Sequence, residues 1–412
     1  MRNLRRSLLR RVAVLAGVGL LGALTATAVS AKPATYGAKK VTAAPFNVLI
    51  VTELSGPFAS FGGAYEPGIF AAGHLINQWG GILGHKVALH FVDDQSSPVT
   101  AVSVLQNALS SGSYNMVISD LSPFTTSLAP LTSKAGLLNL TSATSNGLFK
   151  NKPYPNLFSF SANTYAPEQA MANAIKRKGV TNVGIIAPPT PSATDSAGIL
   201  SKYLSAVGIE SNTVFVPTAT ADATPQLQQV QSKGAQAIAL LGFSPVVNSA
   251  LAARAKLGWN APVYCDNACS AVDWNQIPSD QRSGVLVAQL PISVSGTAAT
   301  KTKSYQFFAK NIVKYDKSFA LGMIVDIEGW NIMMTARAAA MKAKSIDTAN
   351  LITALSSMTQ SSAVPWYVGP RLLFAPDTVG DDDWPNAVHA VAGDYIFVPA
   401  APLVQGLMPS GK

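Results

Sequence analysis

Apolar residues follow two spacing patterns, one typical of strands and one of helices, which alternate along the chain. Val48–Val51 is a continuous apolar run, which is typical of a strand buried on both faces of a parallel sheet. After Leu54-Ser55-Gly56-Pro57 the spacing changes, and from Ile69 to Trp79 apolar residues recur every three or four positions, as on one face of a helix. Gly80-Gly81 follows as a helix stop. This part of the chain is therefore predicted to form a strand, a loop and a helix.

The same alternation continues in two series. The first series adds predicted strands at Lys86–Val92, Met116–Ser119, Leu137–Leu140 and Phe158–Ala162, and the second has them at Val183–Ala187, Thr213–Val216, Ala237–Leu241, Val263–Cys265 and Val285–Ala288. After Pro291 the pattern becomes helical, with long helices near Asp326–Ala343 and Thr348–Met358, before a strand pair at Arg371–Phe374 and Ala390–Val398. Strands that alternate with helices of this length form right-handed βαβ units. We therefore predict an α/β fold with two doubly wound parallel sheets.

Several short motifs carry a family resemblance. The order of Leu54-Ser55-Gly56-Pro57, Gly62, Asn77–Gly84 and Asp93-Asp94 resembles the leucine/isoleucine/valine-binding family of solute-binding proteins, which serve ABC importers. The resemblance implies a type I periplasmic binding protein fold, in which two Rossmann-like lobes joined by three hinge crossovers close on a ligand. The crossovers are expected near Ser161, near Leu290–Ser293 and near Ala363–Val368. Lobe 1 is expected at 46–161 and 292–365, and lobe 2 at 162–291 and 366–412.

Composition and charge narrow the class of protein. With 412 residues, 48% of them hydrophobic, the chain can bury cores for two or three domains and is not disordered. The formal charge of +9 includes five arginines before residue 12, and 9 − 5 leaves +4 for residues 32–412. No dense basic run remains there, so we predict no nucleic-acid partner.

The first 31 residues have the pattern of an export signal. Arginines precede the apolar run Val12–Leu24, and Ala26-Thr27-Ala28 and Val29-Ser30-Ala31 are small-residue cleavage patterns. We expect a signal peptide at 1–31, a flexible leader at 32–45 and a freely diffusing periplasmic protein, since no cysteine at the cleavage site could carry a lipid. Arg5-Arg6 fits both a twin-arginine signal and an ordinary basic segment, so the export route is left open.

Candidate ligand-binding residues follow from the predicted topology and from the family. Ligands bind beyond the carboxyl ends of parallel strands, where helix starts present N–H groups. The family holds a ligand carboxylate with a hydroxyl and N–H groups from the loops after strands three and four, which match Ser122–Thr126 and Ala143–Ser145. The alternative is that these hydroxyls only cap helices, and that Phe61 belongs to the core. The candidates are Ser55, Phe61, Ser122, Thr125, Thr126, Ala143, Ser145, Ser192, Phe243, Asp266 and Asn267.

The second lobe departs from the family at two places. Known amino-acid binders have a tyrosine after the first strand of this lobe, where the chain has Thr190–Thr194, and Phe243 replaces another tyrosine. The acid that pairs with the ligand's ammonium would fall at Asp266 or Asn267. If Asp266 faces the cleft, an amino acid fits; if Asn267 does, a neutral or anionic ligand fits better. Asp266 could equally be a turn residue or a helix cap.

The cysteines and the search for catalytic motifs decide whether a metal-binding protein or an enzyme is expected. Cys265 and Cys269 are the only cysteines, and in an exported protein they are expected to form a disulfide, with two buried thiols as the alternative. No metal or cofactor is predicted. The chain has no GxSxG, HExxH or P-loop motif, and the GxGxxG match at Gly17–Gly22 follows no strand, so an enzyme is not expected.

The predicted function is that of a solute-binding protein for an ABC importer. A monomer would capture a small carboxylate- or amide-bearing solute, a branched-chain or other amino acid, and deliver it to a membrane permease. Two alternatives stay open: a ligand-sensing subunit for a membrane receptor, and a non-amino-acid solute such as urea, an amide or an aromatic acid.

Overall fold

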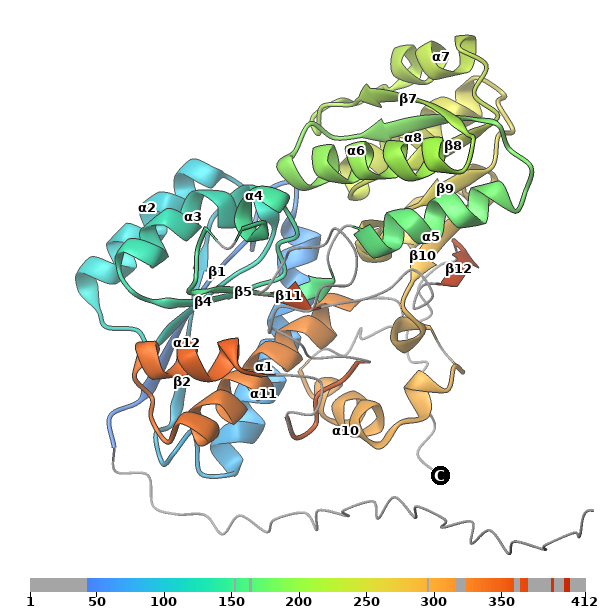
Figure 1. Cartoon of the computed structure of the whole chain (residues 1–412). Coiled ribbons are helices and arrows are strands. Elements are labelled where there is room, and N and C mark those ends of the chain that lie inside the picture. Colours follow the sequence, from blue (N-terminus) through green and yellow to red (C-terminus); the bar gives the residue numbers. More distant parts are fainter. Residues whose placement is uncertain are drawn as a thin grey trace, which may run out of the picture. The chain divides into compact units, whose positions relative to one another are not determined.

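Two six-stranded sheets organise the part of the chain that the computed structural model describes (Figure 1). The described residues are 43–151, 153–162, 165–294, 296–315, 324–358, 364–369, 387–388 and 396–400, all within the unit Gly37–Lys412. The predicted signal peptide, the predicted strand at Arg371–Phe374 and most of the leader lie outside these residues, so they stay predictions. The predicted α/β class, with two mainly parallel sheets, is confirmed.

The first sheet has the strand order β11-β5-β4-β3-β1-β2, and its strand pairs are all parallel. Helices α2 and α3 pack together over one face, and α1 covers the other (Figure 1). The strands are β1 (Phe46–Thr52), β2 (Val87–Asp93), β3 (Met116–Ser119), β4 (Leu138–Thr141), β5 (Leu157–Ala162) and β11 (Ala387–Val388). The helices between them are α1 (Ala59–Gln78), α2 (Pro98–Ser111), α3 (Ser122–Lys134) and the short α4 (Asn146–Phe149).

The second sheet repeats this arrangement in the order β12-β10-β9-β8-β6-β7, with the edge strand β12 antiparallel. Ile185 and Ile186 of β6 point to opposite faces and belong to different apolar clusters, one with α5 and α6 and the other with α7 and α8. The strands are β6 (Asn182–Ala187), β7 (Glu210–Phe215), β8 (Ala237–Leu240), β9 (Val263–Cys265), β10 (Val285–Gln289) and β12 (Ile396–Pro399). The helices are α5 (Tyr165–Lys176), α6 (Pro191–Ala206), α7 (Thr224–Ser232), α8 (Ser244–Lys256) and α9 (Ser279–Arg282).

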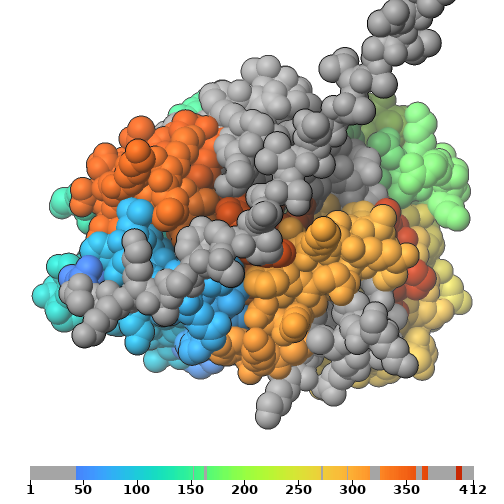
Figure 2. All heavy atoms as spheres, turned by 90° about the horizontal axis from the view of Figure 1, so that it is seen from below, coloured from blue at the N-terminus to red at the C-terminus, as the bar shows by residue number. Residues whose placement is uncertain are grey.

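Three late helices return to the first lobe. These are α10 (Lys303–Ile312), α11 (Ile324–Ala343) and α12 (Thr348–Ser356), and Figure 2 shows their orange atoms beside the blue atoms of α1. The backbones of α1 and α11 approach closely because glycine lies on both sides of the contact. A Cβ atom on Gly68 would lie 2.0 Å from the Asp326 carbonyl oxygen, and one on Gly329 would lie 2.7 Å from the Tyr65 carbonyl oxygen.

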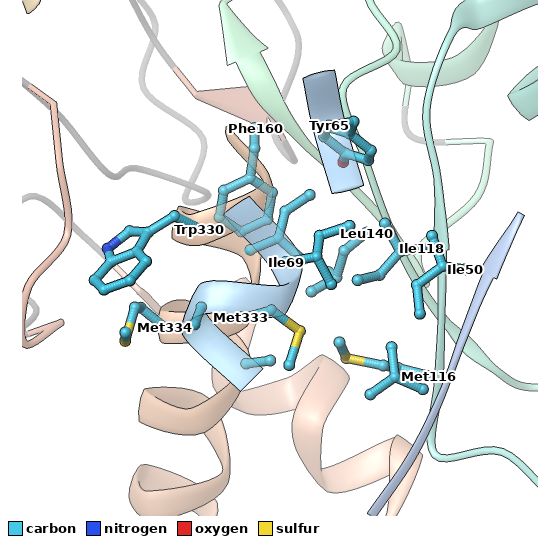
Figure 3. Packing of buried hydrophobic residues seen from close by; sticks show 14 of the residues in the cluster. Ile50, Tyr65, Ile69, Met116, Ile118, Leu140, Phe160, Trp330, Met333 and Met334 are labelled. Atoms are coloured by element: carbon cyan, nitrogen blue, oxygen red, sulfur yellow. The ribbon is translucent and has the colours of Figure 1, made fainter. Parts of the chain in front are cut away.

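The core of the first lobe is built on this helix pair. Figure 3 shows Ile69 of α1 between the side chains of the sheet, such as Ile118 and Leu140, and those of α11, such as Met333. All four side chains are fully buried. The first lobe is therefore complete only when α11 covers the face of α1 that points away from the sheet.

Residues 364–369, beside which the third crossover is predicted, are held on the first lobe. Val368 exchanges hydrogen bonds of 2.8 and 2.7 Å with the side chain of Asn331, and the indole of Trp330 donates to the Trp366 carbonyl, so this segment is held on α11 of the first lobe. β11 then pairs with β5 of the first sheet, whereas β12 pairs with β10 of the second. Residues 364–369 and β11 thus belong to lobe 1 and β12 to lobe 2, and the position of the third crossover stays a prediction. Ala387 and Val388, expected in lobe 2, extend the sheet of lobe 1.

Three helices begin at or beside candidate ligand-binding residues, and this matters for the site. α3 begins at Ser122, α6 at Pro191 and α8 at Ser244. Each has proline at its first or second position, where a missing N–H costs no helical hydrogen bond. The residues expected in loops after the strands therefore form the first turns of helices.

Candidate functional site

A cavity of about 80 Å³ lies where the strand ends of both lobes meet. Its walls come from the carboxyl ends of parallel strands, from the helix starts that follow them, and from α11. This is the place where open parallel sheets bind ligands. The lining residues are Phe61, Leu121, Ser122, Ser142, Thr144, Ser161, Val325 and Glu328 from the first lobe, and Ser192, Ala193, Ser196, Gly242, Phe243, Asp266, Asn267, Ala268 and Ser270 from the second.

One wall of the cavity is aromatic and joins the two lobes. Phe243, at the start of α8, meets Phe61 edge to face with ring centroids 5.7 Å apart, and meets Phe58 in the same way at 5.9 Å. Such contacts contribute about 0.5–1.5 kcal/mol beyond the burial of apolar area. Phe61 and Phe243 both line the cavity, so they offer an apolar surface to whatever fills it.

A hydroxyl-rich wall lies in the first lobe. The Oγ atom of Ser122, in the first turn of α3, accepts the N–H of Thr144 at 2.9 Å, which ties together the segments after β3 and β4. The bond from Thr144 uses a lone pair of the Ser122 oxygen and not its hydrogen, so the hydroxyl can still donate to an acceptor in the cavity. The Ser122 hydroxyl and the first turn of α3 suit a carboxylate or an amide carbonyl.

The sequence left open whether Asp266 or Asn267 faces the cleft, and both residues line the cavity. Asp266 immediately precedes a short 3-10 helix, η1 (Asn267–Ala271), and its Oδ1 accepts the Gly242 N–H at 3.3 Å. Burial raises the pKa of Asp266 to about 7. Cys265 and Cys269 form a disulfide with Cα atoms 6.0 Å apart, and the loop it closes contains both lining residues.

Glu328 lines the cavity and was missed by the sequence reasoning. It lies on α11, and its Oε1 accepts the Ser161 hydroxyl at 2.6 Å. Burial, with a further contribution from the charge of Asp120, raises the pKa of Glu328 to about 7. The one available signal was a pair of acidic residues, Asp326 and Glu328, in the otherwise apolar start of a predicted helix, and nothing in the spacing connected that helix with the strand ends.

Further buried acids interact with Glu328 and Asp266, directly or through one another. Asp120 is fully buried and accepts hydrogen bonds of 2.5 Å from both the Thr52 hydroxyl and the Leu121 N–H. Burial and the charge of Asp120 hold the pKa of Glu53 well above its usual range. On the other side of the cavity, burial and the charge of Asp266 do the same for Glu168. None of the described residues that line the cavity is lysine, arginine or histidine.

Five predicted ligand-binding residues do not line the cavity. Ser55 donates to the Asp93 carboxylate at 2.6 Å, Thr126 donates to the Ser122 carbonyl at 2.6 Å, and the Ala143 N–H donates to Thr141 Oγ1 at 3.0 Å. Thr125 is buried among polar groups of β3 and β4. Ser145 donates to Asp195 at 3.2 Å. A ligand contact from any of the five remains a prediction.

Asp195 links the two lobes beside the cavity. This half-buried carboxylate on α6 accepts the Ser145 hydroxyl at 3.2 Å and the Asn146 N–H at 2.7 Å, both from the first lobe. Hydrogen bonds to a charged group typically contribute about 1.5–3 kcal/mol. We refer to this pair of bonds as the Asp195 bridge.

The described part of the chain contains neither a candidate metal site nor a helix that could span a membrane. No group of three histidine, cysteine, aspartate or glutamate residues there is placed to hold a metal ion. No helix there is both long enough and apolar enough to cross a bilayer.

Comparison with known proteins agrees with this architecture. The sequence matches the family described as periplasmic binding protein over residues 45–385, so the chain belongs to that family. The family and the type I fold expected from the sequence are thereby confirmed. Members of this family are solute-binding proteins.

Individual relatives are similar over different shares of the chain. The "Leu/Ile/Val-binding protein homolog 3" of Brucella melitensis biotype 1 is 35% identical over 79 residues, 19% of this chain and 22% of the relative. The chain thus matches about a fifth of the length of that curated relative.

Solved structures are similar over nearly their whole length. A leucine binding protein from Thermotoga maritima MSB8 has a TM-score of 0.71 and 17% identity, covering 85% of this chain and 97% of that one. A fatty acid ABC transporter substrate-binding protein from Thermomonospora curvata also has a TM-score of 0.71, with 14% identity, covering 92% and 97%. At these identities the likeness establishes the fold, and the two proteins are named for ligands of different kinds, leucine and fatty acids.

Proposed function

We propose that the protein is the exported solute-binding component of an ABC importer and that it captures a small amino acid in the cavity between its lobes. The observation that carries the proposal is the pairing of a hydroxyl-rich wall at Ser122 with a carboxyl group at Asp266 and an aromatic wall at Phe61 and Phe243. The first suits a carboxylate, the second an ammonium and the third an apolar side chain. Capture would be followed by delivery to a membrane permease from the periplasm.

The composition of the cavity supports a small polar solute over a long-chain one. Serine and threonine hydroxyls and two carboxyl groups are among its lining residues. The same cavity would serve a ligand-sensing subunit equally well, and a neighbouring permease or ATPase gene would favour transport over sensing. No catalytic step is part of this proposal.

A thermal-shift panel of amino acids, amides, urea and aromatic acids on the cleaved protein tests the proposed solute class. A solute present at about a hundredfold over its dissociation constant should stabilise the protein by roughly 2.7 kcal/mol. Replacement of Phe243 with alanine should abolish the shift of an apolar amino acid. If no carboxylate or amide in the panel changes the melting temperature, the proposed solute class is wrong.

A further inference from the structure

A single asparagine-glycine pair, Asn146-Gly147, begins α4 beside the Asp195 bridge. Asparagine that precedes glycine loses its side-chain amide more readily than other asparagines do, because glycine has no Cβ to shield the next backbone nitrogen and lets the backbone turn freely. Gly147 is exposed and Asn146 is half-buried, so water reaches the pair. The pair is therefore placed for a chemical modification that solute binding does not use.

The backbone nitrogen that would react is available. Among the described residues, none accepts the N–H of Gly147. Helix α4 has only four residues, and a helix of one turn gains little stability from its own hydrogen bonds. Its backbone can therefore leave the helical conformation at small cost unless another part of the protein holds it.

The second lobe holds the start of α4 through the Asp195 bridge. The Asp195 carboxylate accepts the N–H of Asn146 at 2.7 Å and the hydroxyl of Ser145 at 3.2 Å, and α4 also contacts α6, on which Asp195 lies. Helical backbone at Asn146 keeps the nitrogen of Gly147 away from the side-chain Cγ atom, so the two atoms meet only after α4 has opened locally. The bridge therefore controls how often the reacting atoms can meet.

We propose that Asn146 is a site of deamidation controlled by the Asp195 bridge. When the bridge opens, the Gly147 nitrogen bonds to Cγ of Asn146, the bond from Cγ to the amide nitrogen breaks, and the Gly147 proton leaves with that nitrogen as ammonia. Water then opens the resulting succinimide ring at either carbonyl, which gives aspartate or isoaspartate. The reaction consumes water, releases ammonia and needs no oxidant, cofactor or second protein.

The product of the reaction weakens the bridge that controls it. Aspartate and isoaspartate both put a carboxylate on residue 146, whose own N–H donates to Asp195. Two carboxylates this close repel each other, and isoaspartate also lengthens the backbone by a methylene group at the start of α4. Open lobes therefore favour the reaction, and its product favours open lobes. Deamidation is a one-way change that loosens lobe closure as the protein ages.

Ageing of the purified protein at mildly alkaline pH tests the proposal. Peptide mass spectrometry follows the gain of one mass unit at Asn146. Asp195→Ala should speed this gain by roughly 3- to 30-fold, because loss of the bridge raises the population of the open form. Gly147→Ala should nearly abolish it, because the added methyl group shields the nitrogen. Asp222→Ala is the control, since it removes an exposed ion pair with Lys256 and should react at the wild-type rate.

Milder variants guard against a loss of folding. Asp195→Asn keeps an oxygen that can accept hydrogen bonds, so it should react at a rate between those of the wild type and Asp195→Ala. Alanine fits at position 147, where an added Cβ atom would lie 3.8 Å from the Oγ atom of Ser145. Melting temperatures show whether each variant is folded.

The effect of the product is measured on a variant that carries it from the start. Asn146→Asp should increase the radius of gyration of the solute-free protein in solution scattering, whereas Asn146→Gln, which stays neutral, should not. A wild-type radius of gyration in Asn146→Asp would overturn the link between the product and lobe opening.

The absence of a mass gain at Asn146, or equal rates in the wild type and Asp195→Ala, would overturn the proposed site. None of these measurements uses a solute. Their failure would therefore leave the proposed solute binding intact, and failure of the solute panel would leave the deamidation site standing.

Discussion

At the scale of single residues, the cavity is distinguished by buried acidic side chains whose pKa values are raised. Asp266 and Glu328 each have a pKa of about 7, chiefly because burial disfavours the charged form. Asp94, near the buried Asp120, also has a pKa raised to about 7 by burial and by that charge. The protein thus holds several protons at pH 5 that the unfolded chain would not hold.

This predicts that the solute-free protein becomes less stable as the pH rises from about 4 to about 7. An acid with a raised pKa binds its proton more tightly when folded, so unfolding in this window releases protons and is favoured by higher pH. Melting temperatures measured from pH 4.5 to 8 should fall through the window and then level off. Glu328→Gln should flatten the fall, whereas Asp280→Asn, which changes an exposed acid on α9, should not. A melting temperature that rises steadily through the window would contradict this account.

At the scale of helices and strands, the sequence predicted most elements but not all of their partners. The apolar runs placed β1, β3, β6 and β9 to within a residue or two, because strands buried on both faces leave a continuous signal. Candidates taken from the strand ends included six residues that line the cavity: Phe61, Ser122, Ser192, Phe243, Asp266 and Asn267. Glu328 was missed because α11 reaches the site through tertiary packing, which leaves no local pattern. Thr125 and Ser145 carry the right chemistry but use it on neighbouring protein groups.

The contact between α1 and α11 predicts opposite effects for two glycines of α1. Gly68→Ala places a methyl group against the Asp326 carbonyl and should destabilise the protein by about 1–3 kcal/mol or more. Gly63→Ala, in the same helix with no neighbouring atom within 4 Å, should stabilise it by up to about 1 kcal/mol through helix propensity. Urea unfolding of the two variants beside the wild type measures both. Equal effects would show that α1 and α11 are packed less closely than described.

The disulfide at the cavity wall predicts a change in binding as well as in stability. It closes a loop of only five residues, Cys265 to Cys269, so chain entropy gives about 2 kcal/mol, and replacement of both cysteines by serine should cost about that much. The loop carries Asp266 and Asn267, so its loosening should also weaken the best-binding panel solute. Unchanged affinity in the double serine variant would limit the bond to a role in stability. Mass spectrometry of the periplasmic protein should show no free thiols.

At the scale of the whole molecule, the described residues of the two lobes meet on either side of the cavity. Their contacts include those of Phe243 with Phe58 and Phe61 and the Asp195 bridge. Interactions that exist only when the lobes are together raise the population of the binding-competent arrangement, and apparent affinity scales with that population.

Asp195→Ala should therefore weaken solute binding without touching the cavity, since Asp195 does not line it. Loss of both bonds should lower the apparent affinity by roughly 3- to 30-fold and increase the radius of gyration of the solute-free protein in solution scattering. Asp222→Ala is the control: it removes an exposed ion pair with Lys256 inside the second lobe and should alter neither quantity. A wild-type affinity in Asp195→Ala would show that the bridge does not favour closure.

The packing of α11 on α1 also sets the order in which the chain can finish folding during synthesis and export. Gly68 and Gly329, on the two sides of that contact, lie 261 positions apart (329 − 68), so the face of α1 that points away from the sheet has no cover until most of the chain has been made. Contacts this distant in sequence form slowly. Nascent chains arrested at residue 315 should leave α1 open to protease, whereas chains arrested beyond residue 358 should protect it. Until then the first lobe is an unfinished domain with exposed apolar surface, a form that is prone to aggregation.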